Sequence, residues 1–136
     1  MHRCFCSRLS VMALGKIKAD TLEHSTSGSV DTKFVVEGTG KARGHFEGSD
    51  ATLDDSLNTT SLTDNGTGSF SPQLTSSFAN VNYSAVTECA NTSNTASNSG
   101  SKAQTYATGS FNIVTTQNGS GADIDDTIYI VAGDLA

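Results

Sequence analysis

The sequence predicts an all-β protein, namely an antiparallel β-sandwich or jelly-roll-like domain that carries a short N-terminal arm. About eight short runs rich in β-forming residues follow one another at even spacing. Clusters of Gly, Asn, Asp and Ser separate these runs and are typical of turns. No apolar repeat of helical period continues beyond two turns, so long helices are not expected.

The chain divides into three parts by pattern. We expect residues 1–11 to be a disordered extension, residues 12–29 to be an attachment arm, and residues 30–136 to form the β-sandwich knob domain. A short helix over Lys16–Glu23 is marginal, because a helix of this length needs packing for stability. The run Ser25–Ser29 is a flexible break before the domain.

Three strands are expected at the start of the domain. Val30–Gly38 contains three strong β-formers in a row, and Lys41–Phe46 alternates small or apolar residues with charged ones. In Ala51–Leu57, alternation would place Asp55 on the same face as Leu53. The later strands are expected at Gly68–Leu74, Asn82–Cys89, Lys102–Ala107, Ser110–Thr116 and Asp126–Ala132.

A hairpin is expected at Asp64-Asn65-Gly66, because Asn and Gly tolerate the positive φ that tight turns need. Leu62 precedes this turn and Phe70 follows it, so a strand should lie on each side. Pro72 lies within the second of these strands and lacks an N–H, so it should occupy an edge, a bulge or a position that donates no hydrogen bond. The run Asn91–Ser101 has no large side chain and is expected to be an exposed loop.

Composition and charge limit the partners. The apolar fraction is 35%, with no Trp, which is low for a free-standing domain and favours a core completed by oligomerisation. Residues 1–18 carry four bases and no acid, whereas the rest carries four bases and fourteen acids. An acidic body argues against nucleic-acid binding. No run approaches the roughly 20 apolar residues of a membrane-spanning helix, so membrane insertion is not expected.

The segment Ser61–Tyr83 (SLTDNGTGSFSPQLTSSFANVNY) resembles a segment that recurs in tail-fibre and related appendage proteins of tailed bacteriophages, including marine phages. Lys41–Asn58 fits the same family's pattern without gaps, although Arg43 stands where the family has Trp. Met12–Asp20 is similar to the family's first residues, and Val131–Asp134 is similar to its ending. The resemblance therefore covers roughly Met12 to Asp134, and Met1–Val11 lies upstream of it.

The resemblance implies a structural virion protein, made in the bacterial host cytoplasm and assembled into the virion as a tail fibre or fibre-tip-like subunit. It implies a homotrimer that binds other virion proteins through the arm and contacts a host-surface glycan through the knob. A capsid decoration or head-fibre protein without a receptor role is the alternative. An enzyme such as a capsular depolymerase is not expected, because a carboxylate pair on a long repetitive strand scaffold is missing.

The candidate binding residues belong to the expected loop and to neighbouring strands. Short polar side chains in a loop suit hydrogen bonding to sugar hydroxyls, and tyrosines suit stacking on sugars. The competing interpretations are that the loop is only a connector and that the tyrosines are strand residues of the core. The candidates are Asn91, Asn94, Asn98, Tyr83 and Tyr106.

No cofactor and no catalytic residue are expected. Clustered loop carboxylates at Asp123, Asp125 and Asp126 are a weak alternative calcium site, but their spacing matches no known calcium loop and a solvated acidic turn is the simpler interpretation. His45 is expected to be exposed and without a partner. Asp54 and Asp55 are expected on opposite faces of one strand, which excludes a catalytic carboxylate pair. The three cysteines, an odd number, imply no disulfide framework and are expected to be free thiols: Cys4, Cys6 and Cys89.

Overall fold

The computed structural model describes residues 19–90 and 98–136 of the chain. Within these residues the structure is mostly β, and no helix is long and apolar enough to cross a bilayer. The elements are, in chain order, β1 (Thr21–His24), β2 (Gly28–Asp31), α1 (Thr32–Gly38), β3 (Gly40–Glu47), β4 (Thr52–Leu57), β5 (Thr59–Asp64), β6 (Ser69–Leu74), β7 (Ser84–Cys89), β8 (Ser99–Ala107), β9 (Ser110–Gln117), β10 (Ser120–Gly121) and β11 (Thr127–Ala132).

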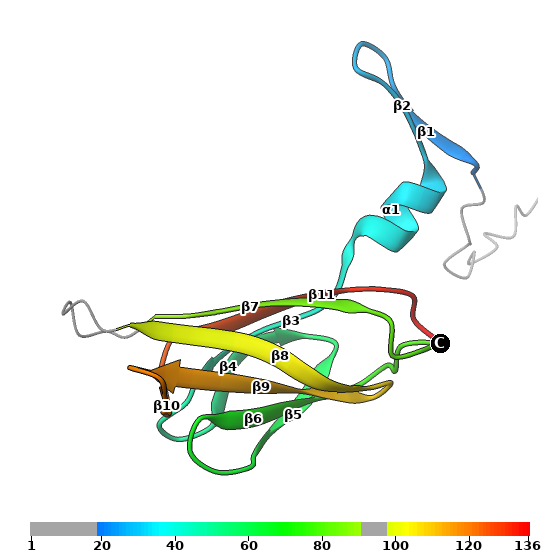
Figure 1. Ribbon diagram of the computed structural model, residues 1–136. Coiled ribbons are helices and arrows are strands. Elements are labelled where there is room, and N and C mark those ends of the chain that lie inside the picture. Colours follow the sequence, from blue (N-terminus) through cyan, green and yellow to red (C-terminus); the bar gives the residue numbers. More distant parts are fainter. Residues whose placement is uncertain (1–18, 91–97) are drawn as a thin grey trace, which may run out of the picture.

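Two antiparallel sheets pack together as the layers of a sandwich (Figure 1). One sheet has the strand order β4-β3-β11-β7. The other has the order β10-β9-β6-β5, and β8 pairs with β9. The predicted all-β sandwich is confirmed, and β3 through β11 form its body.

The core lies between the two sheets and follows the alternation of the strands. In β3 every second residue is buried, from Ala42 to Phe46, as the pattern predicts. The same alternation buries Phe111 and Ile113 in β9. Because successive strand residues point to opposite faces, this spacing places the apolar side chains of both sheets in one layer. The buried apolar cluster comprises Ala42, Phe46, Phe70, Phe78, Tyr83, Phe111, Ile113, Tyr129 and Val131.

Tyr129 in β11 connects the two layers. It pairs with Gly44 of β3, and a Cβ on that glycine would overlap the tyrosine ring. The Tyr129 hydroxyl lies 2.7 Å from the Thr59 hydroxyl of the other sheet. Its ring meets Phe111 edge-on, with ring centroids 5.5 Å apart. A glycine at position 44 therefore allows the largest buried side chain to lie across its neighbouring strand.

Between β4 and β5 the chain passes from one sheet to the other at a single residue. Asn58 lies between β4 and β5 and has a φ of 56°. Its side-chain amide donates to the Ser76 carbonyl at 3.0 Å and accepts from the Ser76 N–H at 2.7 Å. Its own carbonyl accepts from the Thr75 N–H at 3.2 Å. These three hydrogen bonds satisfy the polar groups at a corner where the strand ladder stops.

The predicted hairpin is confirmed between β5 and β6. Gly66 has a φ of 112°, and its N–H donates to the Asp64 carboxylate at 2.8 Å. The Asn65 N–H donates to the Ser69 carbonyl at 2.9 Å and closes the loop. Pro72 is buried in β6, between β5 and β9, so it is not at an edge. The strand pairing of β6 with β9 stops at Phe70 and resumes at Gln73, so Pro72 takes a position that donates no hydrogen bond.

The strand expected over Val30–Gly38 is wrong. Gly28–Asp31 pairs with Thr21–His24 as a hairpin, and Thr32–Gly38 then forms α1. The β-forming residues of this segment have no sheet to join, because the hairpin ends before them. Figure 1 shows the hairpin and α1, in blue and cyan, projecting from the sandwich. We call residues 19–39 the arm, so the described arm extends beyond the expected boundary at residue 29.

The positive φ of Gly66 yields a stability prediction. Replacing Gly66 by Val should lower the free energy of unfolding by about 1–3 kcal/mol, because a β-branched residue is strained at positive φ. A Cβ at Gly66 meets nothing within 4 Å, so the cost comes from the backbone alone. Urea denaturation measures it. Gly38→Val is the control, since Gly38 also has open space and a φ outside the left-handed region. Equal midpoints for the two variants would contradict the prediction.

Candidate functional site

The predicted binding residues fall at opposite ends of the sandwich. Asn98 immediately precedes β8, whereas Tyr106 lies near its end. Eight residues of extended strand span about 26 Å. Tyr83 precedes β7 and lies beside Tyr106, with ring centroids 5.0 Å apart. The expectation that the two tyrosines lie near the Asn91–Ser101 loop is therefore wrong, since β7 and β8 both run from one end to the other.

The tyrosine end is mainly structural. Tyr83 is 7% exposed, and its ring stacks on Phe78 with centroids 4.3 Å apart. Its hydroxyl donates to the carbonyls of Ala107 and Ser110, at 2.7 and 2.9 Å. Burial, together with the neighbouring Tyr106, raises the pKa of Tyr83 to about 12, so the hydroxyl remains a donor at neutral pH. Tyr106 is 36% exposed and keeps part of its ring open to solvent.

A shallow depression lies beside Tyr83, where the arm meets the body. Its lining is polar apart from the tyrosine and combines carboxylates with amides. Glu37 of α1 contributes to it, so the depression depends on the position of the arm. The lining residues are Glu37, Asn80, Asn82, Tyr83, Gly133 and Asp134.

The opposite end of the sandwich, which we call the far end, holds Asn98. Asn91 and Asn94 lie outside the described residues. Asn98 is exposed, and its carbonyl accepts from the Asn118 N–H at 2.9 Å in the β9–β10 turn. Two acidic segments lie at the same end: the β3–β4 turn around Asp50 and the segment Asp123–Asp126 before β11.

The three carboxylates of the alternative calcium site bind separate protein groups. Asp123 accepts from the Gly68 N–H at 2.6 Å, and Asp125 accepts from the Ser49 N–H at 3.0 Å. Asp126 lies 3.3 Å from the His45 ring. Within residues 19–90 and 98–136, no three His, Cys, Asp or Glu side chains converge as a group that could hold a metal ion.

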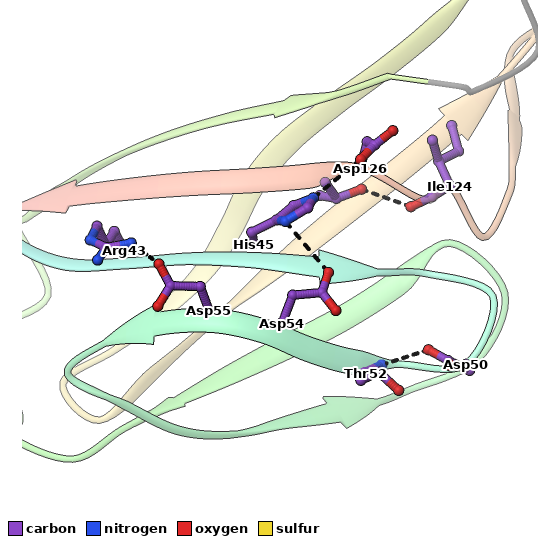
Figure 2. Close-up of polar contacts among 9 residues, drawn as sticks. Arg43, His45, Asp50, Thr52, Asp54, Asp55, Ile124 and Asp126 are labelled. Atoms are coloured by element: carbon purple, nitrogen blue, oxygen red, sulfur yellow. Dashed lines mark hydrogen bonds and ion pairs between the residues drawn. The ribbon is translucent and has the colours of Figure 1, made fainter.

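His45 has two partners that the sequence did not predict. Its Nδ1 lies 3.4 Å from Asp54 and its Nε2 lies 3.3 Å from Asp126, as Figure 2 shows. Asp54 comes from β4 and Asp126 from the segment before β11, which are the two neighbours of β3. His45 thereby connects three segments that are neighbours in the sheet, on its outward side.

A β-bulge explains how both Asp54 and Asp55 reach this surface. His45 pairs with Asp55, but the next residue, Phe46, pairs with Leu53, so Asp54 is the extra residue. A bulge reverses which face of the sheet the side chains on one side of it point to. Here both carboxylates are exposed. The expectation of opposite faces is wrong. The sequence contained a signal for the bulge: a regular strand would have turned the charged Asp55 side chain inward, on the same face as Leu53.

Arg43 forms an ion pair with Asp55 on the same surface (Figure 2). The hydrogen bond and charge of Arg43 lower the pKa of the Asp55 carboxyl. A general acid needs a carboxyl that stays protonated near neutral pH. The Arg43 contact favours the ionised form of the Asp55 carboxyl, so it does not suit Asp55 to act as a general acid.

Glu47 lies among other carboxylates on this surface, and their charges repel its own. Asp54 raises the pKa of its carboxyl most strongly, followed by partial desolvation and the charges of Asp125, Asp50 and Asp126. We call these five carboxylates the acidic cluster. The N–H groups of Gly48 and Ser49 donate hydrogen bonds to residues 124 and 125. These bonds join the β3–β4 turn to the segment before β11, and both regions carry members of the acidic cluster.

Cys89 at the end of β7 is a buried free thiol. Burial raises its pKa, with a smaller contribution from Glu88. Thiolates are the reactive form, so this cysteine is held in the unreactive thiol form. Cys4 and Cys6 lie outside the described residues.

Comparison with known proteins finds no matching family model, no similar characterised protein and no similar solved structure. The geometry of the two ends is therefore what bears on function. The tyrosine end offers a polar depression next to the arm. The far end offers an open surface of carboxylates and amides, which suits hydrogen bonding to a hydroxyl-rich or cationic partner.

The acidic cluster yields a pH prediction. The raised pKa means that the folded state binds a proton more readily than the unfolded chain, so Glu47 contributes stability at low pH and loses it as pH rises through the folded-state value. Glu47→Gln should therefore raise the thermal midpoint at pH 7 and change it little below the ordinary carboxyl pKa.

Thermal denaturation at pH 4 and pH 7, with and without 0.5 M salt, measures this effect. Salt should reduce the gain at pH 7, because exposed charges are screened. Glu23→Gln, which removes one negative charge from the arm, is the control. A gain that is equal for both variants, or that grows on acidification, would be inconsistent with repulsion in the cluster.

Proposed function

We propose that the protein is a structural appendage subunit of a tailed-bacteriophage virion, a tail fibre or fibre-tip-like protein. The observation that carries the proposal is the division of the described chain into a closed β-sandwich and a projecting arm with exposed apolar side chains. A sandwich with an exposed apolar arm suits assembly, because such side chains gain stability when a partner covers them.

The resemblance of Met12–Asp134 to phage appendage proteins supports the same function independently. It includes the Asp64–Gly66 hairpin, which the fold uses, and the final strand with its Val131–Asp134 ending. In this proposal the subunit forms a homotrimer and binds other virion proteins through the arm. No enzymatic step and no cofactor belong to it.

The direction of the arm supports an orientation for the subunit. The arm enters the body at the start of β3, and β3 runs toward the far end. An arm attached to the virion would leave the far end, with Asn98 and the acidic cluster, pointing outward. We therefore assign host contact to the far end, and a host-surface glycan is the partner whose hydroxyls match its amides and carboxylates.

Labelling of the intact virion tests the function. Particles purified from a lysate of the encoding phage should bind an antibody against the β-sandwich at the tail tip or fibres in electron micrographs. Labelling over the capsid would instead support the decoration or head-fibre alternative. Absence of the protein from purified, nuclease-treated particles would refute a virion role of either kind.

Host contact at the far end yields a separate prediction. Replacing Asn91, Asn94 and Asn98 together by Ala should lower the adsorption rate constant about tenfold, the loss expected when several hydrogen bonds at a contact disappear. The measurement is phage adsorption to host cells, with the fold checked by circular dichroism.

The matched control replaces Asn80 and Asn82 by Ala at the tyrosine end. If the control variant adsorbs poorly and the far-end variant adsorbs normally, the assignment of contact to the far end is wrong. Unchanged adsorption for both variants would leave the segment 91–98 as a connector.

A further inference from the structure

The outward face of the β4-β3-β11-β7 sheet carries an apolar patch. Val86 is 72% exposed and Ile130 is 55% exposed, and the strand register places the two side by side. Ile128, also exposed, lies two residues along β11, and Leu57 lies on the same face beyond Arg43. We call these four aliphatic residues the outer patch. Arg43, Asp55 and Glu88 border it, and a polar rim around exposed apolar residues is typical of a protein-binding surface.

The arm carries a second exposed apolar surface. Phe34 is 65% exposed and Val36 is 61% exposed in α1, which has no buried residue. Leu22 and Val30 pair across the hairpin and are exposed as well. A helix of seven residues and a two-stranded hairpin are each marginal alone in water. The arm therefore needs a surface to pack against.

The arm does not reach the outer patch of its own chain. α1 ends at Gly38 and β3 begins at Gly40, so only Thr39 joins them, and its backbone is extended. The Lys41 ammonium donates to the Val36 carbonyl and to the Thr39 hydroxyl, and so ties the end of the helix to the start of the strand. The arm would have to reverse direction within one residue to cover that face, whereas Figure 1 shows it leading away.

Charge favours contact between an arm and a body over contact between two bodies. Residues 19–39 carry one basic and four acidic residues, whereas residues 40–136 carry three basic and ten acidic ones. Two bodies that met through their outer patches would bring two acidic clusters toward each other. An arm brings a smaller net negative charge to the same surface than a second body does, so its approach is opposed by less repulsion.

Each chain offers both halves of the contact, so an arm-to-face contact repeated by rotation closes into a ring of identical subunits.

We propose that the arm of one chain docks on the outer patch of a second copy of the same chain. Phe34 and Val36, with Leu22 and Val30, then cover Val86 and Ile130, and exchange of arms around a ring holds the oligomer together. This contact requires the self-association that is part of the proposed function. It does not require that the protein lies in the virion. Failure of the contact and failure of the virion role are therefore seen in different experiments.

Two full-length variants test the contact. The face variant carries Val86→Lys and Ile130→Lys, and the arm variant carries Phe34→Ser and Val36→Ser. All four residues are exposed, so both variants should fold, as checked by circular dichroism. The milder Val86→Thr with Ile130→Thr replaces the face variant if lysine prevents folding. Val81→Lys, at an exposed position outside both surfaces, is the matched control.

Sedimentation velocity at about 100 μM should show an oligomer for the parent and the control, and a monomer for each variant, since loss of central apolar contacts weakens association about tenfold or more. An equimolar mixture of the two variants should recover a dimer, because the intact arm of the face variant meets the intact face of the arm variant. A monomeric parent, oligomeric variants or a mixture that stays monomeric would each overturn the proposal.

Discussion

The two layers depend on the position of one side chain, Tyr129. Its ring lies over Gly44 in its own sheet, meets Phe111 of the other sheet, and ends in a hydroxyl bonded to Thr59 across the core. Burial raises the pKa of this hydroxyl, so it stays protonated and available for the bond. The arrangement requires a glycine in β3, because any larger residue at position 44 would occupy the space of the ring. Hydrophobic packing and one polar contact thus bring the sheets together at the same point.

Local irregularities determine what this core displays on the outside. The bulge at Asp54 turns two adjacent carboxylates outward, where Arg43 and His45 pair with them. Without the bulge, one carboxylate would face the apolar layer at a considerable desolvation cost. The corner at Asn58 lets the chain change sheets without leaving backbone groups unbonded. Both features are made by short polar residues, and both occur where a regular ladder would bury a charge or expose a strand end.

The two ends of the sandwich differ in chemistry, and the proposed functions follow that difference. The tyrosine end, where the arm joins the body, combines exposed apolar residues with tyrosines that pack largely into the core. The far end combines the acidic cluster with Asn98 on an open surface. Attachment by apolar burial and recognition by hydrogen bonding make opposite demands on solvation, so their separation along the strands is physically reasonable.

The sequence by itself determined the β class, the alternation that buries Phe46, Phe111 and Ile113, and the turn at Gly66. These features are local: they depend on side-chain period and on the φ that one residue tolerates. Tertiary structure decided the rest. The segment Thr32–Gly38 is rich in β-formers but has no neighbouring strand, so it is helical. His45 gained its partners only because β4 and β11 flank β3. The predicted tyrosines lie apart from Asn98 because the length of β8 separates them. Such pairings join residues distant in sequence, and neither period nor composition records which strands become neighbours.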